Sequence, residues 1–423
     1  MKYFFPQPNS TPPVKVFRAK RTLTGLGARC GKITRVPHRA PFNMSTIYVH
    51  WPFCRSKCHY CDFNSIPCAH CIDYSRWLEA YKKILQKYSD KYYQGDPITS
   101  VYFGGGTPSL LPSRFIASIL EEADKLFKLA PNLEITLEAN PKAIGKIKAM
   151  ELKKSGVNRI SIGVQSIIDV DLKMLGRIHS AKEAKACVCE MSEIFDNLSI
   201  DMIYNRPGQS LRNWEEELNA VLAYPIKHIS LYELIIEPNT RLKTMIDSGI
   251  LPLPSSSAIF FEKTIEIARS HGFEMYEVSN FAKDKHYGQH NISYWKYEDY
   301  YGIGAGAHSR CTLAGHKIAI AQISDNYKWL KWAIETKDPA FNEEVLTEDD
   351  EFKEQLIMGL RSKFGINTDV ISEHIKTKYG LKNKLKKLQE NSYIIKKGND
   401  VVLTDEGIMR LNLIIRYLTE ECV

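Results

Sequence analysis

The chain has 423 residues, which is enough for two or three domains around a sizeable hydrophobic core. Its formal net charge is +8, but residues 1–43 hold nine lysines and arginines and no acid, which leaves −1 for residues 44–423. The neutral body argues against a nucleic-acid-binding protein, and no run approaches the roughly twenty apolar residues of a membrane span.

The basic N-terminal segment, residues 1–43, has three interpretations. It could be a mobile arm, an organelle transit peptide, or the result of a start codon assigned too early, because Met44 stands just before the first predicted strand. Prolines at positions 6, 8, 12, 13, 37 and 41 would interrupt the amphipathic helix of a transit peptide. We therefore favour the arm or the early start. A secretory signal is not evident, and we expect the protein in the cytoplasm.

From Ser45 onward, β-rich runs alternate with helical periodicity, which predicts a parallel sheet built from βαβ units. The expected strands are Thr46–His50, Ser100–Phe103, Glu134–Leu137, Arg159–Val164, Leu198–Tyr204 and His228–Leu234. The expected helices are Tyr74–Tyr88, Arg114–Lys128, Ile144–Ser155, Ala181–Phe195 and Leu211–Ala223. Six units are too few for an eight-stranded barrel. The fold class we expect is α/β, with a partial (βα)6 barrel.

The regular alternation of predicted strands and helices ends at about residue 240. A helix is predicted over Ala258–His271, followed by an aromatic, glycine-rich stretch from Tyr276 to His308. From about residue 342 the chain is charged and helical, and Ile394–Thr404 predicts a hairpin, which together indicate a small α+β, winged-helix-like domain. We therefore expect four parts: a tail (1–43), a core (44–240), an extension (241–340) and a C-terminal domain (341–423).

Three of the ten cysteines are closely spaced, as Cys54-x3-Cys58-x2-Cys61. Thiolates in one loop are the usual ligands of iron–sulfur clusters, and three ligands on a four-iron cluster leave one iron open for chemistry. Zinc is the alternative, with Cys68, Cys71 or His59 as a fourth ligand. The other cysteines show no ligand spacing: Cys30, Cys187, Cys189, Cys311 and Cys422. The chain is too large for a typical disulfide scaffold, so we expect a reducing compartment.

Several motifs occur in an order that is more specific than the cysteines alone. They are Tyr48–Phe53 before the cysteines, Tyr102–Ser109, Leu137–Pro141, Gly156–Ser166, Leu175–Arg177 and Ile200–Tyr204. Together they resemble the radical S-adenosylmethionine superfamily, and within it the branch that contains oxygen-independent coproporphyrinogen III oxidase and the heme chaperone HemW. The resemblance runs from about Thr46 to Asn412.

The resemblance implies a [4Fe-4S] cluster on Cys54, Cys58 and Cys61, with S-adenosylmethionine chelating the open iron. It places the methionine end of that cofactor on the run Gly104–Gly106, through Gly105 and Gly106, and on Thr107. Glycines suit this role because no Cβ keeps the backbone away. The other cofactor positions that it implies are Tyr48 beside the cluster, Tyr60 on the adenine, Glu138 on the ribose or sulfonium, Gln165, Arg177 and Asp201.

Two features separate the members of this branch. The oxidase carries a fourth cysteine two residues after the third, where this chain has Phe63. The chaperone carries a His-Asn-x-x-Tyr-Trp run, present here as His290 to Trp295. Imidazole can ligate heme iron and aromatic faces can pack on a porphyrin, so we expect His290, Tyr294 and Trp295 to contact heme, with His308 as a secondary candidate.

The resulting expectation is a heme chaperone that passes heme to acceptor hemoproteins, respiratory ones being candidates. The alternatives are the oxidase itself, which decarboxylates two propionates of a porphyrin precursor, and an interaction module with a structural cluster. We assign no catalytic residue, and the sequence leaves open whether the protein acts as an enzyme.

Overall fold

The computed structural model describes residues 44–68, 72–336 and 341–421. The basic segment 1–43 lies outside the described residues, as do Cys30, Cys71 and Cys422, so the expectations for them remain predictions. Among the helices that the structure describes, none combines the length and apolar character needed to cross a bilayer.

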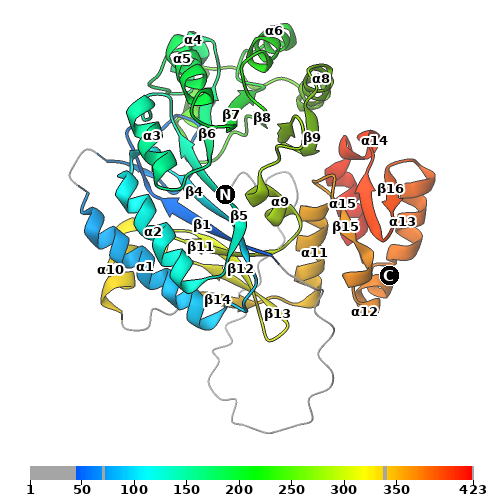
Figure 1. The fold of residues 1–423 in the computed structure, drawn as a ribbon. Coiled ribbons are helices and arrows are strands. Elements are labelled where there is room, and N and C mark those ends of the chain that lie inside the picture. Colours follow the sequence, from blue (N-terminus) through cyan, green and yellow to red (C-terminus); the bar gives the residue numbers. More distant parts are fainter. Residues whose placement is uncertain (1–43, 69–71, 337–340, 422–423) are drawn as a thin grey trace. The chain divides into compact units, whose positions relative to one another are not determined.

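Six parallel strands form the centre of the fold (Figure 1). In spatial order they are β1 (Ser45–Trp51), β4 (Ile98–Gly105), β5 (Leu129–Ala139), β6 (Arg159–Gln165), β7 (Asn197–Tyr204) and β8 (His228–Glu233). The helices between them are α1 (Tyr74–Lys91), α2 (Ser113–Leu126), α3 (Lys146–Lys154), α4 (Asp169–Met174), α5 (Ala181–Ser192) and α6 (Leu211–Leu222). The expected α/β architecture is confirmed, although β5 is longer than the predicted Glu134–Leu137.

Further strands extend this sheet at both edges to twelve. Beside β1 lies β11 (Asp299–Ile303), which is parallel to it, and then come the antiparallel strands β12 (His308–Leu313), β13 (His316–Ala321) and β14 (Asn342–Val345). Beside β8 lie β10 (Asn280–Ala282) and β9 (Glu274–Glu277). The helices of this region are α7 (Arg241–Asp247), α8 (Ser257–Ser270), α9 (Gln289–Trp295) and α10 (Asn326–Glu335).

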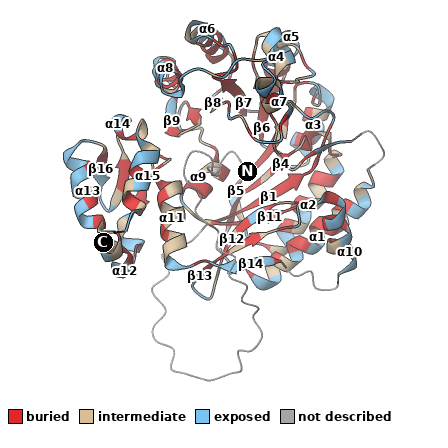
Figure 2. Cartoon of the chain, turned by 180° about the vertical axis from the view of Figure 1, so that it is seen from behind, coloured by how far each residue is buried: buried red, intermediate tan, exposed pale blue. Residues whose placement is uncertain are grey.

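The two faces of the parallel strands differ in chemistry. Side chains on a strand alternate between faces, so Ile47 and Val49 of β1 pack in the main hydrophobic core, while Tyr48 between them points the other way. The second face continues with polar side chains such as Ser100 and Asp201. Most of the strand residues are buried (Figure 2). Parallel strands covered on both faces are usually apolar throughout, so this polar inner face is suited to a ligand.

The C-terminal elements pack around a hydrophobic cluster of their own, which includes Phe352, Tyr379 and Leu418. They are α11 (Glu348–Gly359), β15 (Ile366–Asn367), α12 (Glu373–Lys378), α13 (Leu381–Glu390), β16 (Ile394–Lys397), β17 (Asp400–Leu403), α14 (Asp405–Ile408) and α15 (Leu411–Thr419). The hairpin β16–β17 turns at Gly398 and Asn399, as predicted, and the three strands lie in the order β15-β17-β16. This succession of helix, strand, two helices and hairpin is that of a winged helix.

Candidate functional site

The three clustered cysteines follow the carboxyl end of β1, where ligands bind in parallel sheets. Cys54 ends the short strand β2 (Phe53–Cys54), which pairs with β3 (Ile66–Pro67). Its carbonyl accepts a hydrogen bond from the backbone N–H of Cys68, over 2.9 Å. Cys54 is buried, whereas Cys58 and Cys61 are half-buried.

Burial favours the protonated form of two of these thiols, those of Cys54 and Cys61, in the absence of metal. It raises the pKa of Cys54, and it raises the pKa of Cys61 to about 11, with the nearby Cys58 adding to both shifts. Metal binding deprotonates a coordinating thiol, so iron would reverse this preference. Among the described residues, no three His, Cys, Asp or Glu side chains form a group that could hold a single metal ion, and no disulfide joins the cysteines.

Two of the residues that a zinc site would need have other contacts. The Nδ1 atom of His59 lies 2.9 Å from the carbonyl oxygen of Met174. Cys68 packs against the main hydrophobic core. The third candidate, Cys71, lies outside the described residues.

The glycine run at the end of β4 lies directly against the backbone that leads to Cys54. The N–H of Gly106 donates to the carbonyl of Trp51 over 2.7 Å, and the N–H of Thr107 donates to that of Phe53 over 2.8 Å. A Cβ at position 106 would stand 2.4 Å from the oxygen of Phe53, and Gly105 has a φ of +110°. These glycines are therefore needed to seat the cysteine loop, in addition to the expected role beside a cofactor.

Glu138, near the end of β5, joins the glycine run to an aromatic side chain on β4. Its Oε1 accepts a hydrogen bond from the hydroxyl of Tyr102 over 2.9 Å, and its Oε2 accepts one from the N–H of Gly105 over 3.2 Å. Removal from water is the main cause that raises the pKa of Glu138 to about 7. A cationic ligand beside this carboxyl would favour its ionised form.

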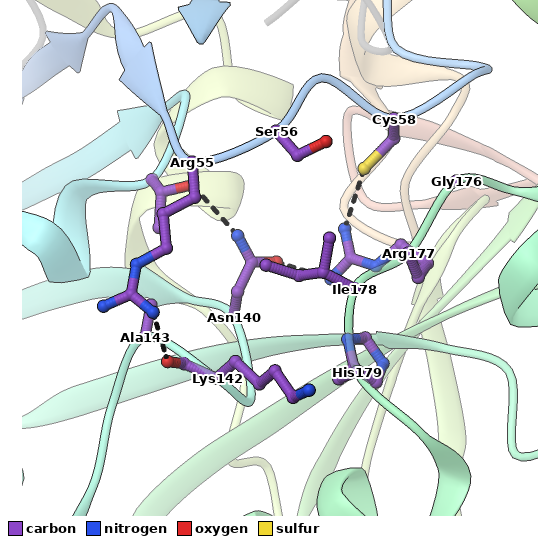
Figure 3. Close-up of a pocket in the computed structure, with 11 residues that line it drawn as sticks. Arg55, Ser56, Cys58, Asn140, Lys142, Ala143, Gly176, Arg177, Ile178 and His179 are labelled. Atoms are coloured by element: carbon purple, nitrogen blue, oxygen red, sulfur yellow. Dashed lines mark hydrogen bonds between the residues drawn. The ribbon is translucent and has the colours of Figure 1, made fainter. Parts of the chain in front are cut away.

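Arg177 connects three neighbouring segments at the edge of a recess that reaches Cys58 (Figure 3). Its Nη1 donates to the Cys58 sulfur over 3.3 Å, and its Nη2 donates to Asn140 Oδ1 and to the carbonyl of Gly163. Asn140 in turn donates to Thr107 Oγ1 over 3.0 Å. The recess encloses about 360 Å³ including its open mouth, and Arg55, Ser56, Lys142, Ala143, Gly176, Ile178 and His179 complete its lining.

Nδ1 of His179, which lines this recess, is buried and has no hydrogen-bond partner among the described residues, and neither do two buried polar atoms of cofactor candidates. They are Oε1 of Gln165, an acceptor, and Nε of Arg177, a donor. Gln165 ends β6 with a φ of +67°, a conformation that an ordinary residue adopts only where its surroundings require it. A ligand with both hydrogen-bond donors and acceptors, as S-adenosylmethionine has, would satisfy them.

The remaining cofactor candidates lie on the same side of the sheet. Asp201 accepts a hydrogen bond from Ser161 over 3.0 Å, and burial raises its pKa to about 6. Tyr48 places its hydroxyl 3.2 Å from His50 Nδ1. Tyr60 is 8% exposed and packs in a small cluster with Leu175. The candidates for the S-adenosylmethionine site therefore lie on the inner face or in the loops after the carboxyl ends of the strands.

The proposed heme residues are buried. His290 and Tyr294 are each 5% exposed and Trp295 is 2% exposed, all three within α9. The ring of Tyr294 packs 4.3 Å from that of Tyr300, measured between centroids. His308 is exposed at the start of β12. In this structure none of the three rings has a face open to a porphyrin, and His290 contacts Ser100 on the inner face.

Sequence reasoning did not single out three residues that the structure brings into the site. Tyr102 and Asn140 stand inside two of the motifs named above, so their position in those motifs was the available signal. Ser100, whose Oγ lies 2.9 Å from His290 Nδ1, carried no signal of its own. The glycine-rich stretch near residue 304 serves packing, because a Cβ there would stand 2.4 Å from the carbonyl oxygen of His50.

Comparison with known proteins agrees with this geometry. Residues 48–221 match the model of the radical SAM superfamily. The chain is 32% identical to the heme chaperone HemW of Bacillus subtilis, over 86% of this chain and 96% of that protein. It is 33% identical to the mitochondrial radical S-adenosyl methionine domain-containing protein 1 of Danio rerio, over 88% of this chain and 86% of that protein. The structure of coproporphyrinogen III oxidase (HemN) from Escherichia coli shares the fold, with a TM-score of 0.74 at 20% identity over 90% of this chain and 91% of that one.

Proposed function

The chain belongs to the radical S-adenosylmethionine superfamily, in the branch that contains the heme chaperone HemW, and on this premise we propose that it binds heme and passes it to acceptor hemoproteins. The observation that carries the proposal is the match to a protein named heme chaperone over 96% of that protein's length. The presence of Phe63 where the oxidase has a fourth cysteine supports the same choice.

In this proposal Cys54, Cys58 and Cys61 hold a [4Fe-4S] cluster. The cluster would supply an electron to S-adenosylmethionine, which is the chemistry of the superfamily. Arg177 and Asn140 position the Cys58 side of the site through the hydrogen bonds described above. Gln165 and Arg177 each offer an unpartnered atom to the cofactor, and Glu138 offers a carboxyl that can pair with a cation.

We also propose His290 as the residue that contacts heme iron. If its Nδ1 carries the proton and donates to Ser100, the lone pair of Nε2 is available to a metal. Tyr294 and Trp295 belong to the same motif, and direct contact between heme and any of these three side chains would require α9 to move, because all three are buried.

Heme uptake and heme transfer by a single preparation of the protein test the proposed chaperone function. Protein reconstituted without oxygen is titrated with heme, and the absorbance of bound heme is followed to saturation. Heme-loaded protein is then mixed with apomyoglobin, whose spectrum reports transfer. We expect stoichiometric uptake followed by transfer, and failure of uptake would reject the chaperone function.

The oxidase activity is the alternative that the same preparation examines. Reductant, S-adenosylmethionine and coproporphyrinogen III are added, and the products are analysed for protoporphyrinogen IX. Formation of that product would make the protein an oxidase. The likeness to the solved oxidase does not favour this outcome, since at 20% identity it concerns the fold alone.

The location and the division of the chain remain proposals. We place the protein in the cytoplasm, with the mitochondrion as the alternative because the Danio rerio relative carries that word in its name. Fluorescent fusions of the whole chain and of residues 44–423 would distinguish the two. We keep the four-part division at residues 43, 240 and 340, which limited proteolysis would test.

A further inference from the structure

His290 is part of a stack of three rings on the inner face of the sheet. Its imidazole lies nearly parallel to the ring of Tyr102, with 4.8 Å between centroids and 25° between planes. Tyr48 stacks on both, at 6.2 Å from His290 and 6.0 Å from Tyr102. We call these residues the three-ring stack. Offset stacking of this kind fixes the orientation of each ring relative to its neighbours.

The three-ring stack leads directly to the cofactor candidates. Tyr102 holds Glu138 through its hydroxyl, and Glu138 holds the N–H of Gly105. The space around Gly104 shows how closely these groups meet. A Cβ there would stand 2.9 Å from a ring carbon of Tyr48 and 3.0 Å from Glu138 Oε1. A shift of the Tyr102 ring would therefore move the carboxyl and the glycine run.

The position of His290 is also fixed by hydrogen bonds, both to its ring and to the backbone of α9. Its Nδ1 is hydrogen-bonded to Ser100 on β4, over 2.9 Å. The backbone N–H groups of Gln289 and His290 donate to the two carboxylate oxygens of Glu134, over 3.0 and 3.2 Å. Glu134 is in turn 3.7 Å from a guanidinium nitrogen of Arg159. The imidazole is thus held in one orientation beneath Tyr102.

We propose that His290 is a positioning residue of the S-adenosylmethionine site, acting through Tyr102 on Glu138 and Gly105. This inference rests on the cofactor site proposed above, and it gives the histidine a role separate from any contact with heme. The part of the side chain that matters for this role is its flat ring, whereas a contact with iron requires its nitrogen.

Two substitutions separate the roles. His290→Ala removes ring and nitrogens, whereas His290→Phe keeps a flat ring and removes the nitrogens. We measure the affinity of the reconstituted proteins for S-adenosylmethionine from the change it causes in the electron paramagnetic resonance spectrum of the reduced cluster. We expect binding to weaken about tenfold in His290→Ala, which loses the stacking on Tyr102 and Tyr48. In His290→Phe, which keeps a flat ring, we expect binding to weaken by less than about threefold.

His228→Ala is the matched control. His228 is also a buried histidine of the inner face whose Nδ1 is bonded to a serine, Ser199, over 2.6 Å. Its ring packs beside Tyr276 and has no stacking contact with Tyr102. We expect His228→Ala to bind S-adenosylmethionine as the parent does. Equal weakening in the two alanine variants would indicate general loosening and overturn the proposal, as would unchanged binding in His290→Ala.

If His290→Ala does not fold, Tyr102→Phe tests the proposed positioning of Glu138 instead. This variant keeps the ring and removes the hydroxyl that holds Glu138, so we expect weaker binding of S-adenosylmethionine with the iron content unchanged. Unchanged binding would overturn the proposal. Heme uptake by His290→Phe is measured on the same samples. Its loss with intact cofactor binding would support both roles of His290, whereas failure of heme uptake in the parent would reject the chaperone function alone.

Discussion

The guanidinium of Arg177 donates a hydrogen bond from Nη1 to the sulfur of Cys58, across 3.3 Å. The same guanidinium holds the loop after β5 through Asn140 and the end of β6 through Gly163. One side chain therefore links the cysteine loop to two neighbouring strands. Residues that are far apart in the chain are thereby brought together at one place in the fold.

Arg177→Lys should weaken the binding of S-adenosylmethionine without loss of iron. Lysine keeps the charge but lacks the planar fork that contacts three groups at once. Hydrogen bonds to charged groups contribute about 1.5–3 kcal/mol, so we expect affinity to fall by about ten- to a hundredfold. Binding is followed by the spectral change of the reduced cluster. Arg212→Lys, in an exposed ion pair on α6, is the control. Parent-like affinity of the Arg177 variant would contradict the assignment.

Cys58→Ala should abolish the brown absorbance of the reconstituted cluster. Two thiolates cannot replace three around a four-iron core, and a lost ligand exposes a further iron. Iron and sulfide are measured per chain beside the visible spectrum. Cys189→Ala, an exposed cysteine on α5, should retain both. If Cys58→Ala kept its full iron content, Cys58 would not be a ligand.

Gly106→Ala should destabilise the protein and reduce cluster loading. The new Cβ would stand 2.4 Å from the carbonyl oxygen of Phe53, which is backbone and cannot move without displacing Cys54. We expect a loss of about 2–4 kcal/mol in the free energy of unfolding, measured in urea. Gly145→Ala is the matched control, because nothing lies within 4 Å of its Cβ position. Equal stability of the two variants would show that the glycine run is not tightly packed.

Glu277 should make stability fall as the pH rises from about 4.5 to 7. It is 1% exposed, and burial raises its pKa from the usual 4.5 to about 7. In that window the folded protein retains a proton that the unfolded chain has released, so stability is full below pH 4.5 and lost toward pH 7. The loss amounts to about 3 kcal/mol.

Urea unfolding at several pH values measures this effect, with Glu277→Gln as the comparison. Asn280 and the charge of Arg361 oppose the shift, and both remain in the variant. Because Gln cannot ionise, the decline between pH 4.5 and 7 should be smaller in the variant by the contribution of Glu277. Identical pH profiles would mean that Glu277 ionises normally.

The local periodicity of the sequence predicts the six central strands and most of the helices between them. The alternation of strands and helices predicted six parallel strands, and all six are present between Ser45 and Glu233. The hairpin around Gly398 was predicted from its turn residues. These features are encoded by residues within one turn or one strand of each other, so a single sequence contains the signal.

Strand β11 is an element that the local sequence pattern does not predict. Asp299 pairs with Ser45 at the start of β1, whereas the sequence pattern places Asp299–Ile303 in an aromatic, glycine-rich stretch and predicts no strand there. Pairing between strands so distant in the chain leaves no local pattern. The same applies to the glycines near residue 304, whose neighbour is the backbone of His50.

The sequence by itself determined the order of the central strands and helices, the three-cysteine loop and the family to which the chain belongs. Only the tertiary structure decided that the inner face is polar across several strands, that Arg177 reaches Cys58, and that His290 stacks on Tyr102. The physical reason is register. Which side chains meet across a sheet depends on how strands pair, and a slip of one residue would turn each side chain to the other face.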